Sequence, residues 1–176
     1  MTTEQDTALK GLKTAIQMEI DGKQFYLKAS RESRNEAGKK LLKSLAAEED
    51  IHRQKFEEIF ESIRDKNAWP KVDFKPDGGS SLRTLFSRAT EQVGKSIKAA
   101  KSEMDAVQTA EGMEGKTYDF YIKQSQVTPY PAARDFYEAL ASQEREHQLI
   151  LVDYYEYLKN PAAWFVHSEH PSLDGV

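Results

Sequence analysis

The sequence predicts an all-α protein: a bundle of four long helices arranged as two repeated antiparallel hairpins joined by a long crossover. Glycine and proline are few, at 9 and 6 of 176 residues, so a 3.6-residue apolar period runs without interruption through four windows. Short breaks separate the first window from the second and the third from the fourth, which forces each pair into an antiparallel hairpin. More than 30 residues, 69–101, lie between the hairpins.

The four windows cover about residues 6–33, 36–68, 102–127 and 131–161. At about 1.5 Å per residue, helices of this length span roughly 37 to 50 Å, which is typical of bundles. We expect Trp69-Pro70 to end the second helix, because the residue before a proline disfavours the helical region. Ser102, with Asp105 three residues later, resembles a capping box and is expected to begin the third.

The connection between the hairpins determines the direction of the helices. It opens with Pro70, Pro76, Gly78 and Gly79, and a short helix is expected near residues 82–89. A connection of this length can traverse the whole bundle. The second and third long helices can therefore run parallel, unlike those of a simple up-and-down bundle.

Length and composition bound the class of protein. We expect one domain over residues 1–176, with the bundle at about 6–160 and a C-terminal tail at 161–176, because a chain of this size can bury a stable core. With 39% hydrophobic and 31% charged residues, the chain is too apolar for a disordered protein and too polar for a membrane protein.

Three further observations limit the kinds of site, the partners and the cellular location that we expect. The chain has no cysteine, which excludes disulfide scaffolds, thiolate zinc sites and iron–sulfur clusters. Its net charge of −4 argues against binding of a nucleic-acid backbone. Residues 1–17 contain no apolar run of the kind found in secretory signals, so we expect a cytoplasmic protein.

The sequence repeats itself at an offset of 95 residues. Residues 14–30 align with 109–125, and eight of these 17 positions are identical, Glu19 with Glu114 among them. The same offset, without a gap, aligns three further pairs: Leu45 with Leu140, Glu49 with Glu144, and His52 with His147. The whole hairpin is therefore repeated.

Six of the repeated residues are polar although they lie on apolar helix stripes. In the second helix, Glu49 and His52 fall between Leu45 and Phe56. Burying an unpaired ion in a core costs several kcal/mol even after relaxation, so this cluster needs neutralisation. Its members are Glu19, Glu49, His52, Glu114, Glu144 and His147.

Two divalent cations would neutralise the cluster. Lys23 is the one basic residue near these stripes, and its long side chain can reach outward to solvent. The spacing Glu-x-x-His directs both side chains to one spot on a helix face. One glutamate from each of two helices and one Glu-x-x-His from each of the other two form the dinuclear carboxylate site of such bundles. We expect Glu49 and Glu144 to bridge the two metals.

Polar residues beside the motifs are not expected to be metal ligands. Four are expected on solvated faces, namely Glu48, Asp50, Arg145 and Glu146. His167 and His170, in the tail, are expected at the surface. Tyr26 and Tyr121 lie two turns beyond the glutamates of their helices and are expected in the core, with hydrogen bonding to a metal ligand as the alternative.

Through these six residues and the order of the helices, the sequence resembles the rubrerythrin family of the ferritin-like superfamily over about residues 6–160. The resemblance implies a catalytic non-haem centre with two iron ions. In many members this centre reduces hydrogen peroxide with electrons from rubredoxin-type partners. It implies these roles: Glu19 and Glu114 as terminal carboxylate ligands, Glu49 and Glu144 as bridging carboxylates, and His52 and His147 as imidazole ligands.

Two features depart from the family's pattern. Full-length rubrerythrins add a rubredoxin domain with a four-cysteine iron site, whereas this chain has no cysteine. The family's seventh ligand, a glutamate three residues after the third-helix ligand, corresponds here to Thr117. Glu111, three residues before Glu114, lies on an inward face and is the candidate for an additional metal ligand or for a hydrogen-bond acceptor beside the ligands. The alternative is a partly exposed helix carboxylate.

The leading functional hypothesis is a diiron oxidoreductase that reduces hydrogen peroxide with an external rubredoxin-like donor. Three alternatives remain open at this stage: a ferroxidase or iron-handling protein that uses dioxygen, a hydroxylase-like enzyme, and a non-enzymatic binding module that metals hold together. The donor set also suits manganese or a mixed metal pair.

The resemblance also implies an oligomer, and we expect a homodimer. Trp164-Phe165, in the tail, is a candidate anchor for this association, because two adjacent aromatic side chains need burial. The alternative is that the pair packs on its own bundle.

Overall fold

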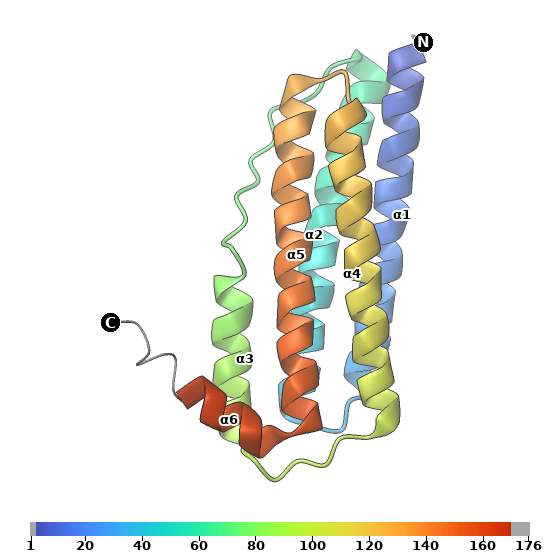
Figure 1. The fold of residues 1–176 in the computed structure, drawn as a ribbon. Coiled ribbons are helices and arrows are strands. Elements are labelled where there is room, and N and C mark those ends of the chain that lie inside the picture. Colours follow the sequence, from blue (N-terminus) through green and yellow to red (C-terminus); the bar gives the residue numbers. More distant parts are fainter. Residues whose placement is uncertain (1–2, 170–176) are drawn as a thin grey trace, which may run out of the picture.

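The computed structural model describes residues 3–169, and all of its regular elements are α-helices (Figure 1). These elements are α1 (Thr3–Glu32), α2 (Glu36–Lys66), α3 (Ser80–Val93), α4 (Lys101–Val127), α5 (Pro131–Lys159) and α6 (Pro161–Glu169). The predicted fold class is confirmed.

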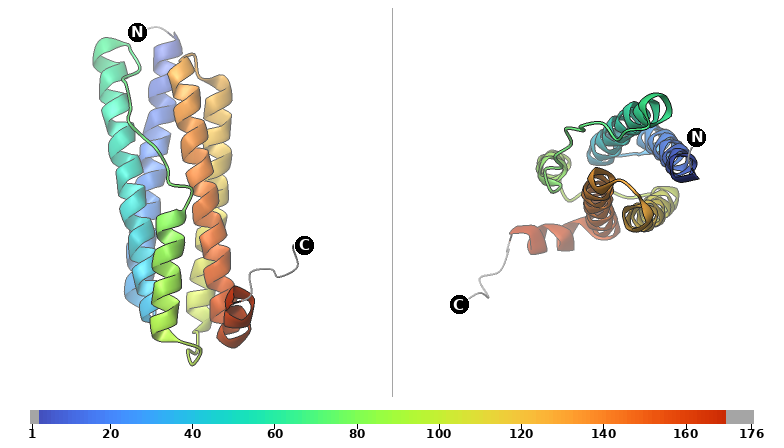
Figure 2. Two further views of the ribbon diagram at one scale, coloured as in Figure 1. Left: turned by 90° about the vertical axis from the view of Figure 1, so that its left-hand side faces the viewer. Right: turned by 90° about the horizontal axis from the view of Figure 1, so that it is seen from above.

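The four long helices form two hairpins that lie side by side. Helices α1 and α2 pack along each other, and so do α4 and α5. The connection after α2 returns along the outside of the bundle, where α3 packs against α2 (Figure 2). Because of this return, α2 and α4 run in the same direction, as the sequence predicted.

Two helix ends differ from the expected positions. Helix α2 ends at Lys66, before Trp69-Pro70, because Asn67 adopts the left-handed conformation (φ 50°) and its N–H bonds to the carbonyl of Ile63. Helix α4 begins after Ala100 with no side-chain cap, so the predicted capping box at Ser102 is wrong. Its first turn is held instead by tertiary hydrogen bonds to buried Glu103.

The apolar core has two parts, one on each side of a polar layer. One part includes Leu45, Tyr26 and Leu151 and lies toward the α1–α2 turn. The other includes Leu12 and Phe56 and lies toward the α4–α5 turn. The six repeated polar residues occupy the stripe positions between these two parts.

The C-terminal aromatic residues pack on their own bundle. Trp164 contacts the rings of Phe86 and Tyr157 at centroid distances of 5.6 and 5.3 Å, and its Nε1 donates to Asp153 at 2.6 Å. Phe165 is also buried. The interpretation of this pair as a dimer anchor is therefore wrong, and the dimer itself stays a prediction.

The expectation that the two tail histidines lie at the surface can be compared with the structure for one of them. His167 is exposed, as expected, whereas His170 lies outside the described residues.

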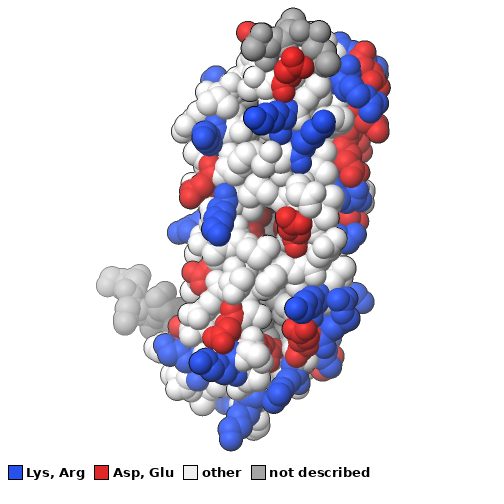
Figure 3. Space-filling view, turned by 90° about the vertical axis from the view of Figure 1, so that its right-hand side faces the viewer, with Lys and Arg blue, Asp and Glu red and all other residues white. Residues whose placement is uncertain are grey.

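On the surface drawn in Figure 3, acidic and basic side chains are interspersed, with uncharged surface between them. Among residues 3–169, none of the helices combines the length and apolar character that crossing a membrane would require.

Candidate metal centre

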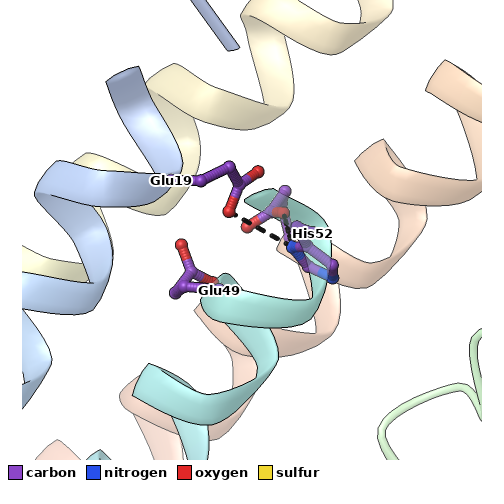
Figure 4. Close-up of side chains that lie close together, drawn as sticks. Glu19, Glu49 and His52 are labelled. Carbon is purple, nitrogen blue, oxygen red and sulfur yellow. Dashed lines mark ion pairs between the residues drawn. The ribbon is translucent and has the colours of Figure 1, made fainter. Parts of the chain in front are cut away.

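The bundle brings the six repeated polar residues together at its centre. Helix α1 supplies Glu19, α2 supplies Glu49 and His52, α4 supplies Glu114, and α5 supplies Glu144 and His147. All six side chains are buried, with exposed fractions between 0 and 4%. In Figure 4, Glu19 and His52 point toward each other, and Glu49 lies beside them.

The six residues form two overlapping groups of possible ligands. One group is Glu19, Glu49, His52 and Glu144, and the other is Glu49, Glu114, Glu144 and His147. Within each group the ligand atoms lie within 4.8 Å of one another. Glu49 and Glu144 belong to both groups, which is the position that bridging carboxylates require.

Each imidazole directs its Nδ1 atom into the cluster. Nδ1 of His52 lies 3.4 Å from Glu19 Oε2 and 3.1 Å from Glu144 Oε1. Nδ1 of His147 lies 3.2 Å from Glu49 Oε1 and 3.5 Å from Glu144 Oε2. The two rings stack at 5.8 Å between centroids, with 13° between their planes. The arrangement has the approximate twofold symmetry that the repeat predicts.

Several of these buried donor atoms have no hydrogen-bond partner. They are Oε2 of Glu19, Oε1 of Glu49, both carboxylate oxygens of Glu144, and Nδ1 of His52 and of His147. Buried polar groups are normally satisfied, so such a concentration of unpaired atoms needs an explanation. Lys23 provides none, since it pairs with Asp50 at 2.8 Å. The unpaired atoms are carboxylate and imidazole donors, which suit iron or manganese.

Two tyrosines hold the terminal glutamates across the bundle. The Tyr26 hydroxyl of α1 donates to Glu114 Oε1 of α4, and the Tyr121 hydroxyl of α4 donates to Glu19 Oε1 of α1. Both tyrosines are buried. The tyrosines therefore lie in the core, as expected, and each also donates a hydrogen bond to a candidate ligand. Such contacts orient ligands and tune their basicity.

Burial and mutual repulsion shift the acidity of the carboxylates. Burial, followed by the charges of Glu19 and Glu144, raises the pKa of Glu49 to about 8. Burial is also the main cause of the raised pKa values of Glu19 and Glu114. For Glu144, burial acts to raise the pKa, but attraction to the nearby His147 and His52 outweighs it, so its pKa is lowered.

The histidines respond to the same carboxylates. Burial alone would lower the pKa of His52 and of His147, but the surrounding glutamates outweigh it, and both pKa values lie well above the usual range. Without metal, protons therefore compensate the carboxylate charge. Divalent cations bound here would displace those protons.

In a comparison with protein-family models, the model described as Rubrerythrin matches residues 10–155. This chain belongs to the rubrerythrin family. The matched range includes all six clustered residues. No match was found among curated proteins or among solved structures.

The rubrerythrin match does not extend the cluster to a seventh residue. Glu111 is partly buried and belongs to neither group of possible ligands among the described residues. Thr117, at the position of the family's additional glutamate, turns its hydroxyl back to the carbonyl of Met113 at 3.1 Å. The structure thus brings together six of the seven candidate ligands.

One residue beside this rubrerythrin-type cluster was misassigned from the sequence. Glu48 was expected on a solvated face, but its Oε2 lies 2.7 Å from Nε2 of His147 and accepts a hydrogen bond from Gln143 at 2.6 Å. The 95-residue offset aligns Glu48 with Gln143 directly before the two Glu-x-x-His motifs, but this alignment alone does not indicate a contact with His147. Glu146, in contrast, pairs with Arg83 away from the cluster.

Proposed function

We propose that this chain is a non-haem diiron oxidoreductase that reduces hydrogen peroxide to water with electrons from an external donor. The observation that carries the proposal is the buried pair of overlapping ligand groups, several of whose atoms lack hydrogen-bond partners, in a member of the rubrerythrin family. A pair of ferrous ions supplies two electrons, one from each ion, which matches the two-electron reduction of an O–O bond.

The chain's own residues would hold the metals in fixed places. Glu19 and His52 would serve one position, Glu114 and His147 the other, and Glu49 and Glu144 would lie between them. Four carboxylates suit both the ferrous and the ferric state, because they offset much of the positive charge in each. Manganese could occupy the same donors.

The tyrosines keep the terminal ligands in position during the reaction. Burial, followed by the charge of a nearby glutamate, raises the pKa of Tyr26 and of Tyr121 well above the usual range. Both hydroxyls therefore stay protonated near neutral pH and remain hydrogen-bond donors. Oε1 of each terminal glutamate is held in this way, and Oε2 of Glu19 has no hydrogen-bond partner and would remain for a metal.

The electrons must return from outside the chain. Reducing one peroxide molecule to two waters consumes two electrons and two protons, after which the metal pair is oxidised. These 176 residues contain no cysteine, so they cannot form a four-cysteine iron site of the rubredoxin type. We therefore propose a separate rubredoxin-like protein as the donor.

The test mixes reduced, iron-loaded protein with peroxide and, separately, with dioxygen. The proposal expects a single peroxide molecule consumed per site, faster than dioxygen, with turnover resuming only when a rubredoxin-like donor and its reductase are added. Rapid reaction with dioxygen but not with peroxide would replace the proposal with iron oxidation. Reaction with neither would leave the metals a structural role.

A further inference from the structure

The two candidate ligand histidines differ on the side that faces away from the cluster. Nε2 of His147 lies 2.7 Å from Glu48 Oε2, so this imidazole reaches from a carboxylate on one side to the ligand cluster on the other. Nε2 of His52 is equally buried but has no hydrogen-bond partner. Its ring meets the edge of Phe74, from the crossover, at a centroid distance of 5.7 Å.

The internal repeat shows which residue makes this difference. Glu48 and Gln143 occupy the same position of the repeat, one residue before Glu49 and Glu144. The Gln143 amide donates to Glu48 at 2.6 Å, and its Oε1 is buried without a partner. The six ligands follow the twofold symmetry, whereas this pair of neighbours breaks it.

A carboxylate on the far nitrogen has two effects on an imidazole ligand. It holds the N–H on Nε2, which leaves the lone pair of Nδ1 directed at the metal, and it makes the ring a stronger donor. His52 has no carboxylate at its Nε2, so neither effect applies to it. Loss of such a partner typically weakens metal binding by roughly 10- to 100-fold.

We infer that Glu48 makes the two metal positions unequal, so that the position at His147 fills first and binds more tightly than the position at His52. The inference rests on the metal-binding part of the proposed function and is independent of the oxidant. Glu48 acts through His147 and is a positioning residue. Its negative charge also lies near His52, so the test must separate the hydrogen bond from simple charge attraction.

The experiment measures Co(II) binding to metal-free protein by calorimetry, in two backgrounds that each keep one histidine. In the His52→Ala background, Glu48→Gln should weaken binding at the remaining His147 position by about 10- to 100-fold. In the His147→Ala background, the same substitution should have little effect. Equal weakening in both backgrounds would show charge attraction alone, and no change in either would show a merely structural role. Both results overturn the inference.

A reciprocal variant tests whether a carboxylate at the other member of the pair strengthens metal binding at His52. In the double variant Glu48→Gln with Gln143→Glu, the carboxylate moves to the other member of the pair, and the tighter position should move from His147 to His52. A double variant that still binds more tightly at His147 would contradict the inference. Circular dichroism checks that each variant folds.

The intact pair of histidines gives a second route if an alanine variant does not fold. Wild-type protein should then give two binding steps, and Glu48→Gln should weaken only the tighter one. Two equal steps in the wild type would end the inference while leaving the proposed function in place. No Co(II) binding at all would instead remove the proposed function.

Discussion

Gly22 of α1 lies directly against the carboxylate of Glu49 on α2. A Cβ atom added at Gly22 would stand 2.6 Å from Glu49 Oε2, closer than side-chain carbon atoms normally approach. The glycine is in the middle of a helix, where it is intrinsically unfavourable. Its lack of a side chain leaves room for a candidate bridging ligand.

Gly22→Ala should therefore separate folding from metal binding. Alanine is favoured over glycine inside a helix by about 1 kcal/mol, and the Glu49 side chain can move, so the metal-free protein should remain folded. Metal affinity should fall because the bridging carboxylate is displaced. Thermal unfolding and a metal titration measure the two effects.

Gly112→Ala is the matched control. Gly112 also lies within a helix, and an added Cβ would meet no atom within 4 Å. This variant should gain helix stability and keep wild-type metal affinity. If Gly22→Ala bound metal as well as Gly112→Ala does, Glu49 would not be a ligand in its observed position.

The stability of the metal-free protein should fall as the pH rises from about 5 to about 8. The pKa of Glu49 is raised from 4.5 to about 8, so its contribution is complete below the lower value and is lost as the pH rises through the upper one. The raised pKa values of Glu19 and Glu114 act in the same direction. The lowered pKa of Glu144 acts oppositely, but only in acid.

Metal should remove most of this pH dependence, because bound cations replace the protons. Thermal unfolding followed by circular dichroism, with and without metal, makes the comparison. A melting temperature of the metal-free protein that rises from pH 5 to pH 8 would show that protons do not stabilise the empty cluster.

Removing a tyrosine hydroxyl should weaken the metal position that it supports. Tyr26→Phe removes the donor to Glu114 and should affect the His147 position, whereas Tyr121→Phe removes the donor to Glu19 and should affect the His52 position. A lost hydrogen bond to a buried charged group costs about 1 to 3 kcal/mol. Calorimetry with Co(II) in the single-histidine backgrounds measures each effect. If either variant weakened both positions equally, the pairing of tyrosines with positions would be wrong.

Glu103 should contribute to the stability of the fold but not to metal binding. Its Oε1 accepts hydrogen bonds from Ser33, from Asn35 at 3.1 Å and from Tyr154 at 2.6 Å, which ties α4 to the α1–α2 turn and to α5. Glu103→Ala should lower the free energy of unfolding by on the order of 3 kcal/mol. Glu32→Ala, at a nearby exposed position, is the control and should change little. Urea unfolding and metal content measure both, and loss of metal from Glu103→Ala would count against this separation.

The helical period and the internal repeat together predicted the cluster, because both patterns single out the same residues. Periodicity alone places Glu49 on an inward face, and the repeat shows that Glu144 does the same in the second hairpin. Together, the period and the repeat place the carboxylates and imidazoles of the cluster in the core. The length of the crossover allows α2 and α4 to run parallel, and in the structure they do.

The remaining features depend on contacts between helices, which neither pattern contains. Glu48 lies off the apolar stripe of its own helix, and only the placement of α2 against α5 brings it to His147. Glu103 likewise accepts hydrogen bonds from Ser33 and Asn35 at the end of the opposite hairpin. The aromatic pair in the tail had two possible partners, and the bundle's own Phe86 and Tyr157 proved to be the ones used.

The most direct test of the account is the iron content of Glu144→Ala compared with that of Glu146→Ala. Glu144 belongs to both ligand groups and is fully buried, whereas Glu146 is two residues away and pairs with Arg83. After anaerobic loading with Fe(II), wild-type protein and Glu146→Ala should each retain two iron ions per chain. Glu144→Ala should retain fewer and lose the reaction with peroxide. Two tightly bound iron ions in folded Glu144→Ala would contradict the assignment of this cluster as the metal centre.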